Sequence, residues 1–302
     1  MHKKLYIATI LVLLGADAWA QQFQQFSQYQ FVQYAFNPAF AGSDSLFNGF
    51  AIHRSQWSGI TDAPRTYQMG LHAPSKSGKM GFGGNLFTDV TGPTRRFGVQ
   101  GSYAYHIQTS RTTKLSFGVT FGLTQFTIDG SQITLREQGD QSIINAMQSE
   151  MLPDAAFGIL WYGNNFTLGA SATQILNNRL ELFPGDGQGS LETHYHLTGS
   201  YKLPIAEKFA IEPAALVKFV SPVPVQADFS LRGIYNGNLW LGFSYRTTNA
   251  AVIYAGYDIM NYLSLGYSYD ISTSDIRNYS DGSHELLIRL RFGQKQMLEQ
   301  QN

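Results

Sequence analysis

Residues 263–270 read Leu-Ser-Leu-Gly-Tyr-Ser-Tyr-Asp, with a large apolar or aromatic side chain at every second position. Successive side chains of a β-strand point to opposite sides, so Leu263, Leu265, Tyr267 and Tyr269 would share one face. The other face would carry only Ser, Gly, Ser and Asp. This strict alternation predicts a strand with one apolar face and one small, polar face.

The same alternation recurs in other stretches of the chain, among them residues 97–105, 115–124 and 239–246. In each, the second face is mainly Gly, Ser, Thr and single charges, without the Lys/Glu-rich coat of a sheet in water. A soluble sandwich would alternate as well, because one face meets a core. Small polar residues on the second face and aromatic residues near the strand ends are typical of membrane barrels. They favour an apolar face that contacts lipid over one that packs in a soluble core. Because unpaired backbone groups are not tolerated in hydrocarbon, such a sheet must close into a barrel.

Composition supports this interpretation and narrows the function. Charged residues make up only 14% of the 302 residues, and aromatic residues also reach 14%. The 21 basic and 21 acidic residues balance, so we expect no nucleic-acid partner. The absence of cysteine excludes disulfides, thiolate metal sites and a lipoprotein anchor.

The first 20 residues are predicted to be a signal peptide. Lys3 and Lys4 precede a short apolar run, which is too short to span a bilayer as a helix. Ala18-Trp19-Ala20 then supplies the small-x-small pattern of a cleavage site. We therefore predict a signal peptide over 1–20, an N-terminal periplasmic segment over 21–45, an outer-membrane β-barrel over 46–292 and a periplasmic tail over 293–302.

Turn signals between the alternating runs predict an all-β, transmembrane, antiparallel up-and-down β-barrel of about 14 strands. The even-numbered connections are tight and rich in Gly and Asn, which supply the positive φ angles of short turns. The long connections, over 55–64, 130–152, 177–192 and 273–283, are all odd-numbered. Short periplasmic turns and long outer loops are typical of outer-membrane barrels. The expected strands start near residues 47, 65, 80, 96, 113, 154, 165, 193, 209, 226, 239, 250, 262 and 284.

An ordered set of short motifs lies before and within the first strands. It comprises Phe26-Ser27-Gln28-Tyr29, Asn37-Pro38-Ala39-Phe40-Ala41-Gly42, Arg54-Ser55-Gln56-Trp57-Ser58-Gly59, Ala63-Pro64, His72-Ala73-Pro74 and Gly81-Phe82-Gly83-Gly84. In order and spacing, this set resembles the PorP/SprF family of the type IX secretion and gliding systems of Bacteroidetes. The resemblance is densest over residues 26–101.

The resemblance implies a location in the outer membrane of a Gram-negative, Bacteroidetes-like cell, with membrane lipid around the barrel. It implies no catalytic site and no cofactor. It also implies that the protein supports export or surface attachment of a large secreted surface protein or adhesin, together with type IX secretion components.

Nine residues in or beside these motifs are candidates for docking a partner. Residues 21–42 are either a lead-in that pairs along the barrel base, or a plug or docking strip. Trp57 either anchors at the headgroup level, as interfacial tryptophans do, or contacts surface cargo. The candidates are Phe26, Gln28, Tyr29, Asn37, Pro38, Arg54, Gln56, Trp57 and Asp62.

Patterns that would indicate catalysis or metal binding are missing from the sequence. No Gly-x-Ser-x-Gly elbow, phosphate loop or zinc motif occurs, so we expect no enzyme, although scattered Ser, His and Asp leave a barrel hydrolase as an alternative. His194 and His196 share a strand face without a third ligand nearby, which favours hydrogen-bonded lumen histidines over a metal site. Five charges on late strands should pair across the lumen or line a selective channel: Asp228, Arg232, Arg246, Asp258 and Asp270.

The main alternative function is an outer-membrane channel or transporter for small or hydrophobic solutes. Asn37-Pro38-Ala39 resembles part of the N-terminal hatch of fatty-acid transporter barrels. A barrel of this strand number is wide enough to hold a pathway.

Overall fold

The computed structural model describes residues 24–44, 46–132, 147–180, 189–260 and 262–293. The predicted signal peptide and nearly all of the predicted tail lie outside these ranges. Within them, no helix is long and apolar enough to cross a membrane.

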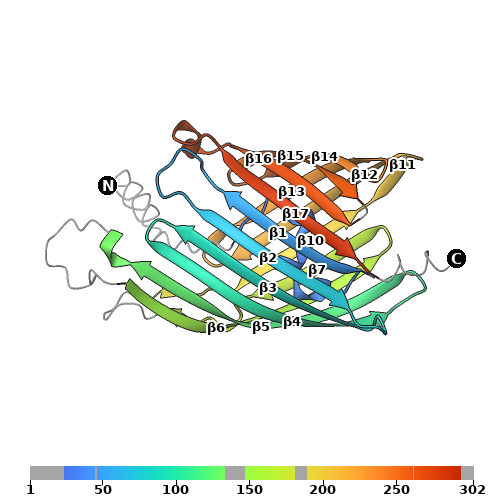
Figure 1. Cartoon of the computed structure of the whole chain (residues 1–302), viewed down its shortest axis with the longest axis horizontal. Helices are drawn as coiled ribbons and strands as arrows, with labels where there is room; N and C mark the ends of the chain where they lie inside the picture. The colour runs from blue at the N-terminus through green and yellow to red at the C-terminus, as the bar shows by residue number, and fades with distance from the viewer. Residues whose placement is uncertain (1–23, 45, 133–146, 181–188, 261, 294–302) are drawn as a thin grey trace, which may run out of the picture.

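Fourteen antiparallel strands of the described chain form a closed barrel (Figure 1). Each strand pairs with its sequence neighbour, and β1 pairs with β17 to close the ring. The predicted fold class and strand number are therefore confirmed. The strands are β1 (Phe47–Ser55), β2 (Arg65–Pro74), β3 (Met80–Thr91), β4 (Thr94–Gln108), β5 (Thr113–Asp129), β6 (Met147–Gly163), β7 (Phe166–Thr173), β10 (His194–Tyr201), β12 (Phe209–Val220), β13 (Val223–Tyr235), β14 (Leu239–Arg246), β15 (Ala250–Met260), β16 (Leu263–Ser272) and β17 (Ser283–Phe292).

The described chain also contains short strands and 3-10 helices that are not part of the fourteen-stranded ring. A short strand, β11 (Leu203–Ala206), extends the sheet beside β12, and β8 (Arg179–Leu180) pairs with β9 (Gly189–Ser190) in the connection between β7 and β10. Short 3-10 helices follow β5, as η4 (Gly130–Gln132), and β16, as η5 (Asp275–Asn278). Three more lie before β1: η1 (Tyr29–Phe31), η2 (Gln33–Ala35) and η3 (Pro38–Phe40).

Strand β6 is the one element whose predicted start is far from the observed one. It begins at Met147 rather than near Asp154, because residues 147–153 pair with the outer end of β5. Gln148, Ser149 and Glu150 interrupt the alternation there, so the sequence pattern predicted a loop. The β5–β6 hairpin is consequently longer than expected.

The two faces of the wall have the environments that the alternation predicts. On β14, Leu241 and Phe243 are exposed by 61% and 52%, whereas Trp240 and Arg246 are buried in the lumen. The short turns gather at one end of the barrel, and the β1–β2 and β16–β17 loops lie at the other (Figure 1). By the loop lengths of outer-membrane barrels, the short-turn end faces the periplasm and the long-loop end faces outward.

Candidate functional site: the plugged lumen

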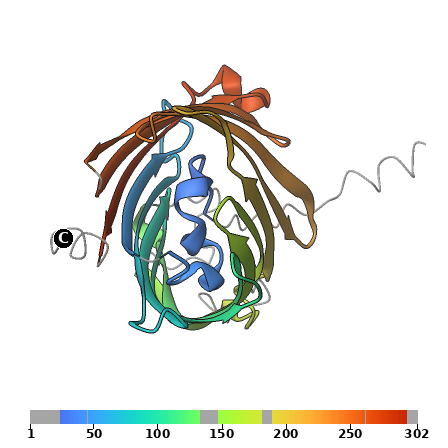
Figure 2. The ribbon, with the colours of Figure 1, turned by 90° about the vertical axis from the view of Figure 1, so that its right-hand side faces the viewer.

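The segment before β1 occupies the inside of the barrel. Figure 2, which looks into the barrel, shows this segment in the middle of the ring. The sequence placed a periplasmic segment over 21–45, but the structure puts its described part, residues 24–44, within the lumen. We call these residues the plug. Its aromatic side chains reach the wall from the inside, so it buries a surface that a periplasmic position would leave in water.

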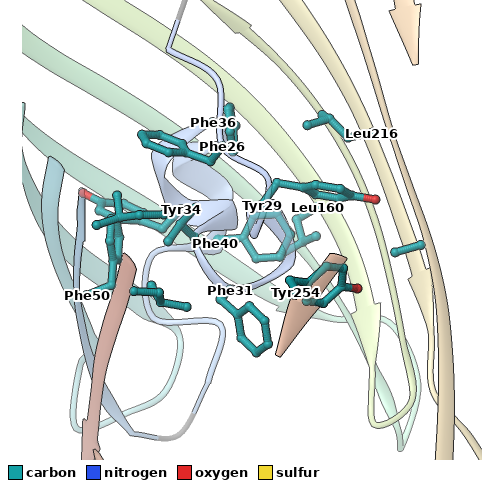
Figure 3. Close-up of a cluster of buried hydrophobic side chains, with 14 of the residues drawn as sticks. Phe26, Tyr29, Phe31, Tyr34, Phe36, Phe40, Phe50, Leu160, Leu216 and Tyr254 are labelled. Atoms are coloured by element: carbon teal, nitrogen blue, oxygen red, sulfur yellow. The ribbon is translucent and has the colours of Figure 1, made fainter. Parts of the chain in front are cut away.

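An aromatic cluster fixes the plug at the centre of the lumen (Figure 3). Its side chains are almost fully removed from solvent, as a soluble core would be. Phe26 meets Phe36 edge to face at 5.9 Å between ring centroids. The plug contributes Phe26, Tyr29, Phe31, Tyr34, Phe36 and Phe40, and the wall contributes Phe50, Leu160, Leu216 and Tyr254.

Residues 26–28 of the plug, here called the latch, are held at the outer end of the lumen by a buried charge network. The backbone N–H groups of Ser27 and Gln28 each donate to the Glu285 carboxylate at 2.8 Å. The Ser27 hydroxyl donates to Asp270 at 2.6 Å and accepts from Arg54 at 2.9 Å. Every one of these wall groups is charged, so the latch is held mainly by electrostatics.

The network joins six charges from six different strands, three of each sign. Arg54 pairs with Asp270 at 2.7 Å and with Glu285 at 3.3 Å. Arg246 pairs with Asp270 at 3.0 Å. Two further pairs extend the network: Arg246–Asp228 at 2.7 Å and Lys218–Asp228 at 3.8 Å. Because the signs balance and the partners are close, the cost of burying these charges is largely compensated.

Residues 37–42, the foot of the plug, lie at the periplasmic end and meet the wall differently. Glycines of β3, β5 and β6 form a bed on which the foot rests. A Cβ added at Gly81 would overlap the backbone of Ala41, and one at Gly118 would overlap the backbone between Pro38 and Ala39. Only glycine leaves room for main chain to approach this closely.

Hydrogen bonds to the wall complete the foot. The Asn37 side chain donates to the carbonyl oxygens of Ile159 at 3.0 Å and Ala170 at 3.2 Å, and it accepts from the Ala39 N–H at 2.9 Å. The last bond caps η3, the usual role of an Asn before a short helix. His106 Nε2 bonds the Ala41 carbonyl at 2.9 Å.

Between latch and foot, aromatic side chains of the plug contact polar groups of the wall. The buried Tyr34 hydroxyl donates to the Ser102 hydroxyl at 2.9 Å. The Phe31 ring lies near two guanidinium groups, 4.3 Å from Arg232 and 4.9 Å from Arg289. Such contacts favour one orientation of the ring.

The nine predicted docking residues divide into two groups. Phe26, Gln28, Tyr29, Asn37, Pro38 and Arg54 are buried inside the barrel, where they hold the plug. Gln56, Trp57 and Asp62 lie on the β1–β2 loop at the outer rim. The structure therefore does not bring the nine together into one exposed surface.

Hydrogen bonds from the backbone of the β1–β2 loop join this loop to the β16–β17 loop and to the β3–β4 turn. Trp57 N–H donates to the Ser283 hydroxyl at 3.0 Å, and Ser58 exchanges bonds with Gly282 and Asp281 of the β16–β17 loop. Asp62 O accepts from Gly92 of the β3–β4 turn at 3.0 Å. Trp57 and Asp62 have φ angles of 52° and 59°, so both residues adopt the left-handed conformation. The β1–β2 loop thus has a defined shape, with Asp62 exposed and Trp57 half-buried.

The remaining candidates also face the lumen. His196 lies 5.5 Å from Phe36, ring to ring, and among the described residues no group of three His, Cys, Asp or Glu could hold a metal ion. The predicted cross-strand pairing of lumen charges is present: Asp228, Arg246 and Asp270 belong to the network, Arg232 pairs with Glu212, and Asp258 pairs with Arg291. Sequence reasoning missed Ser27, Glu285, Lys218 and the glycine bed. The glycines had a visible signal, since Gly81, Gly118 and Gly158 occupy lumen positions of alternating strands.

Fold and site together define a class: a transmembrane β-barrel of the outer-membrane type whose lumen is filled by its own N-terminal segment. The model of the family described as type IX secretion system membrane protein PorP/SprF matches residues 18–290. The chain belongs to this family, and the resemblance inferred from its motifs is confirmed. The family and the barrel are those of non-enzymatic secretion and outer-membrane proteins, and family membership implies association with secretion-system components.

Solved structures of outer-membrane barrels align with this chain at low sequence identity. The toluene transporter TbuX of Ralstonia pickettii aligns with a TM-score of 0.51 and 11% identity, over 85% of this chain and 92% of that one. A FadL homologue of Pseudomonas aeruginosa aligns with a TM-score of 0.43 and 12% identity, over 82% and 88%. A search of curated proteins found no match.

Proposed function

We propose that this protein is a closed, non-catalytic barrel of the type IX secretion apparatus that supports export or surface attachment of large cargo proteins or adhesins. The observation that carries the proposal is the plug. The lumen is occupied by residues 24–44, and the cavities between the plug and the wall are small: about 20 Å³ near Arg96 and Asp154, and about 140 Å³ beside Phe31 and Arg289. A folded cargo protein therefore meets the rim of this barrel and does not pass through it.

The outer rim is the surface where such a cargo would dock. The β1–β2 and β16–β17 loops are joined through Ser58, so they present one continuous, defined surface. Trp57 and Asp62 lie on it, and Tyr279 of the second loop is 78% exposed. An exposed aromatic on an ordered loop is a favourable contact for a protein partner. In this proposal the six buried candidate residues act indirectly, because they keep the plug in place.

Affinity isolation of the tagged full chain from native membranes tests this function. We expect type IX components and a large surface protein to be recovered with it. Replacing Trp57 and Tyr279 by Ala should reduce recovery of the surface protein about tenfold, as loss of two interface hot-spot residues would. Tyr262→Ala, at a periplasmic turn, is the matched control and should change nothing. Recovery of no type IX component, or equal recovery of the surface protein with all variants, would contradict the proposal.

Transport of a hydrophobic solute is the second candidate. It is supported by the fold shared with the toluene transporter TbuX and by the position of Asn37-Pro38-Ala39 inside the lumen. The full lumen argues against it, because a pathway would require the plug to move. Uptake of a monoaromatic hydrocarbon into vesicles containing the purified wild-type protein would favour this candidate. Absence of uptake above that of empty vesicles would favour the docking role.

A further inference from the structure

The lipid-facing surface of the barrel contains an apolar groove on β17 and β1 to β4. Its volume is about 500 Å³. Gly49 and Gly84 form its floor, because neither has a side chain and an added Cβ would meet no atom closer than 3.7 Å. We call it the glycine groove. Its walls are apolar side chains of neighbouring strands, the half-buried Phe47 and the exposed Met69, Leu71, Leu86, Val99, Ile288, Leu290 and Phe292.

Aromatic pairs mark the periplasmic end of the glycine groove. Phe47, at the start of β1, stacks on Phe292, at the end of β17, with 4.5 Å between ring centroids. On the next strands, Phe82 and Tyr103 lie 5.5 Å apart. Aromatic girdles of outer-membrane barrels lie at the headgroup level. The groove therefore extends from the periplasmic interface into the hydrocarbon, where the molecules around it are lipid chains.

Positive charge lies beyond the aromatic pairs on the same strands. The β2–β3 turn carries Lys76 and Lys79, and both are exposed. No acidic residue occurs between Asp62 and Asp89, a stretch that the structure describes throughout. The two lysines are thus uncompensated by their own strands. An uncompensated pair at the membrane surface attracts an anionic headgroup.

We propose that the glycine groove binds an acyl chain of an anionic phospholipid from the periplasmic leaflet, with the phosphate held by Lys76 and Lys79. The floor lets a hydrocarbon chain lie against the backbone of the wall, where packing at close range stabilises contacts inside a membrane. The lysines select a lipid with an anionic headgroup, and the groove fixes where its acyl chain lies on the barrel. The groove includes β2 and β3, and the two lysines lie on the turn between these strands, so one lipid molecule would meet both features.

Lipid retention by the purified full chain tests the proposal. The protein is delipidated in detergent, titrated with dioleoyl phosphatidylglycerol or dioleoyl phosphatidylcholine, and examined by native mass spectrometry. We expect one retained phosphatidylglycerol and a preference of at least tenfold over phosphatidylcholine. Gly84→Leu should reduce retention of both lipids about tenfold, because the leucine side chain occupies the groove. Ala255→Leu adds similar bulk to an exposed position of β15 outside the groove and should have no effect.

A second pair of variants isolates the headgroup. Replacing Lys76 and Lys79 by Gln should abolish the preference for phosphatidylglycerol, whereas replacing both by Arg should preserve it. Heat-modifiable migration of each variant on a gel verifies that the barrel is folded, and Gly49→Leu replaces Gly84→Leu if that variant fails to fold. Equal retention by wild type and the groove variants would overturn the proposal. So would retention of lipopolysaccharide, or of a protein segment, in place of the phospholipid.

Discussion

The two ends of the plug are held by opposite physical means. The latch meets charged side chains on strands far apart in the sequence, and 258 residues separate Ser27 from Glu285. The foot meets glycines and carbonyl oxygens, with little charge involved. Removing a charge should therefore loosen the outer end of the plug, whereas adding side-chain volume to the glycine bed should loosen the foot.

The largest effect should come from the latch network. Arg54→Ala removes the cation shared by Asp270 and Glu285, and loss of one partner from a buried network costs about 3–5 kcal/mol. Urea unfolding in lipid vesicles, followed by tryptophan fluorescence, measures the change. Arg179→Ala, on the exposed side of β8, should stay within about 0.5 kcal/mol of wild type. Equal stability of the two variants would show that the network does not hold the barrel and plug together.

Steric conflict under the foot should have the next largest effect. Gly118→Val places side-chain atoms where the backbone of Pro38 and Ala39 lies, and overpacking of this kind costs about 1–3 kcal/mol. Gly101→Val is the control, because a Cβ there meets nothing within 4 Å. Because the chain has no cysteine, thiol labelling at Gln25→Cys and at Ser43→Cys can report on each end separately. Gly118→Val should accelerate labelling at the second position only, and Arg54→Ala at the first only.

Substitution of Asn37 should have a smaller effect on stability. Two different substitutions separate the contribution of its hydrogen bonds to the wall from that of its cap on η3. Asn37→Ala loses two hydrogen bonds to the wall and the cap of η3, with an expected cost of about 1–2 kcal/mol. Asn37→Asp retains the acceptor that caps Ala39 but loses the donors. If the wall bonds dominate, the Asp variant should be at least as destabilised as the Ala variant. Recovery of wild-type stability by the Asp variant would assign the role to the cap alone.

The smallest expected effect concerns the middle of the plug. Tyr34→Phe removes one buried hydrogen bond to Ser102 and should cost about 1 kcal/mol. Tyr67→Phe, on the lipid face of β2, should be neutral within the error of the unfolding measurement. A cost above about 3 kcal/mol for Tyr34→Phe would mean that this hydrogen bond also stabilises other hydrogen bonds of the lumen, beyond the pair of Tyr34 and Ser102.

The wall could be predicted from sequence because its pattern is local. In residues 263–270, apolar and polar side chains alternate regardless of which strands lie beside them. Because lipid contacts one side of the wall, the apolar side chains must be on that side. The length of β6 could not, since Gln148 to Glu150 pair with β5 without an apolar pattern. The plug has no periodicity, and its wall partners are 27 to 258 residues away in the chain. Only the glycines of its bed are visible as a local sequence pattern. Their role could be interpreted only once the position of the plug was known.

Conductance across a planar lipid bilayer tests most directly whether the plug closes the barrel. The comparison is between the purified wild-type protein and a variant that lacks residues 24–42. The account predicts a silent wild type and stable, ion-conducting channels from the deletion variant. Open channels of equal conductance from both proteins would contradict it.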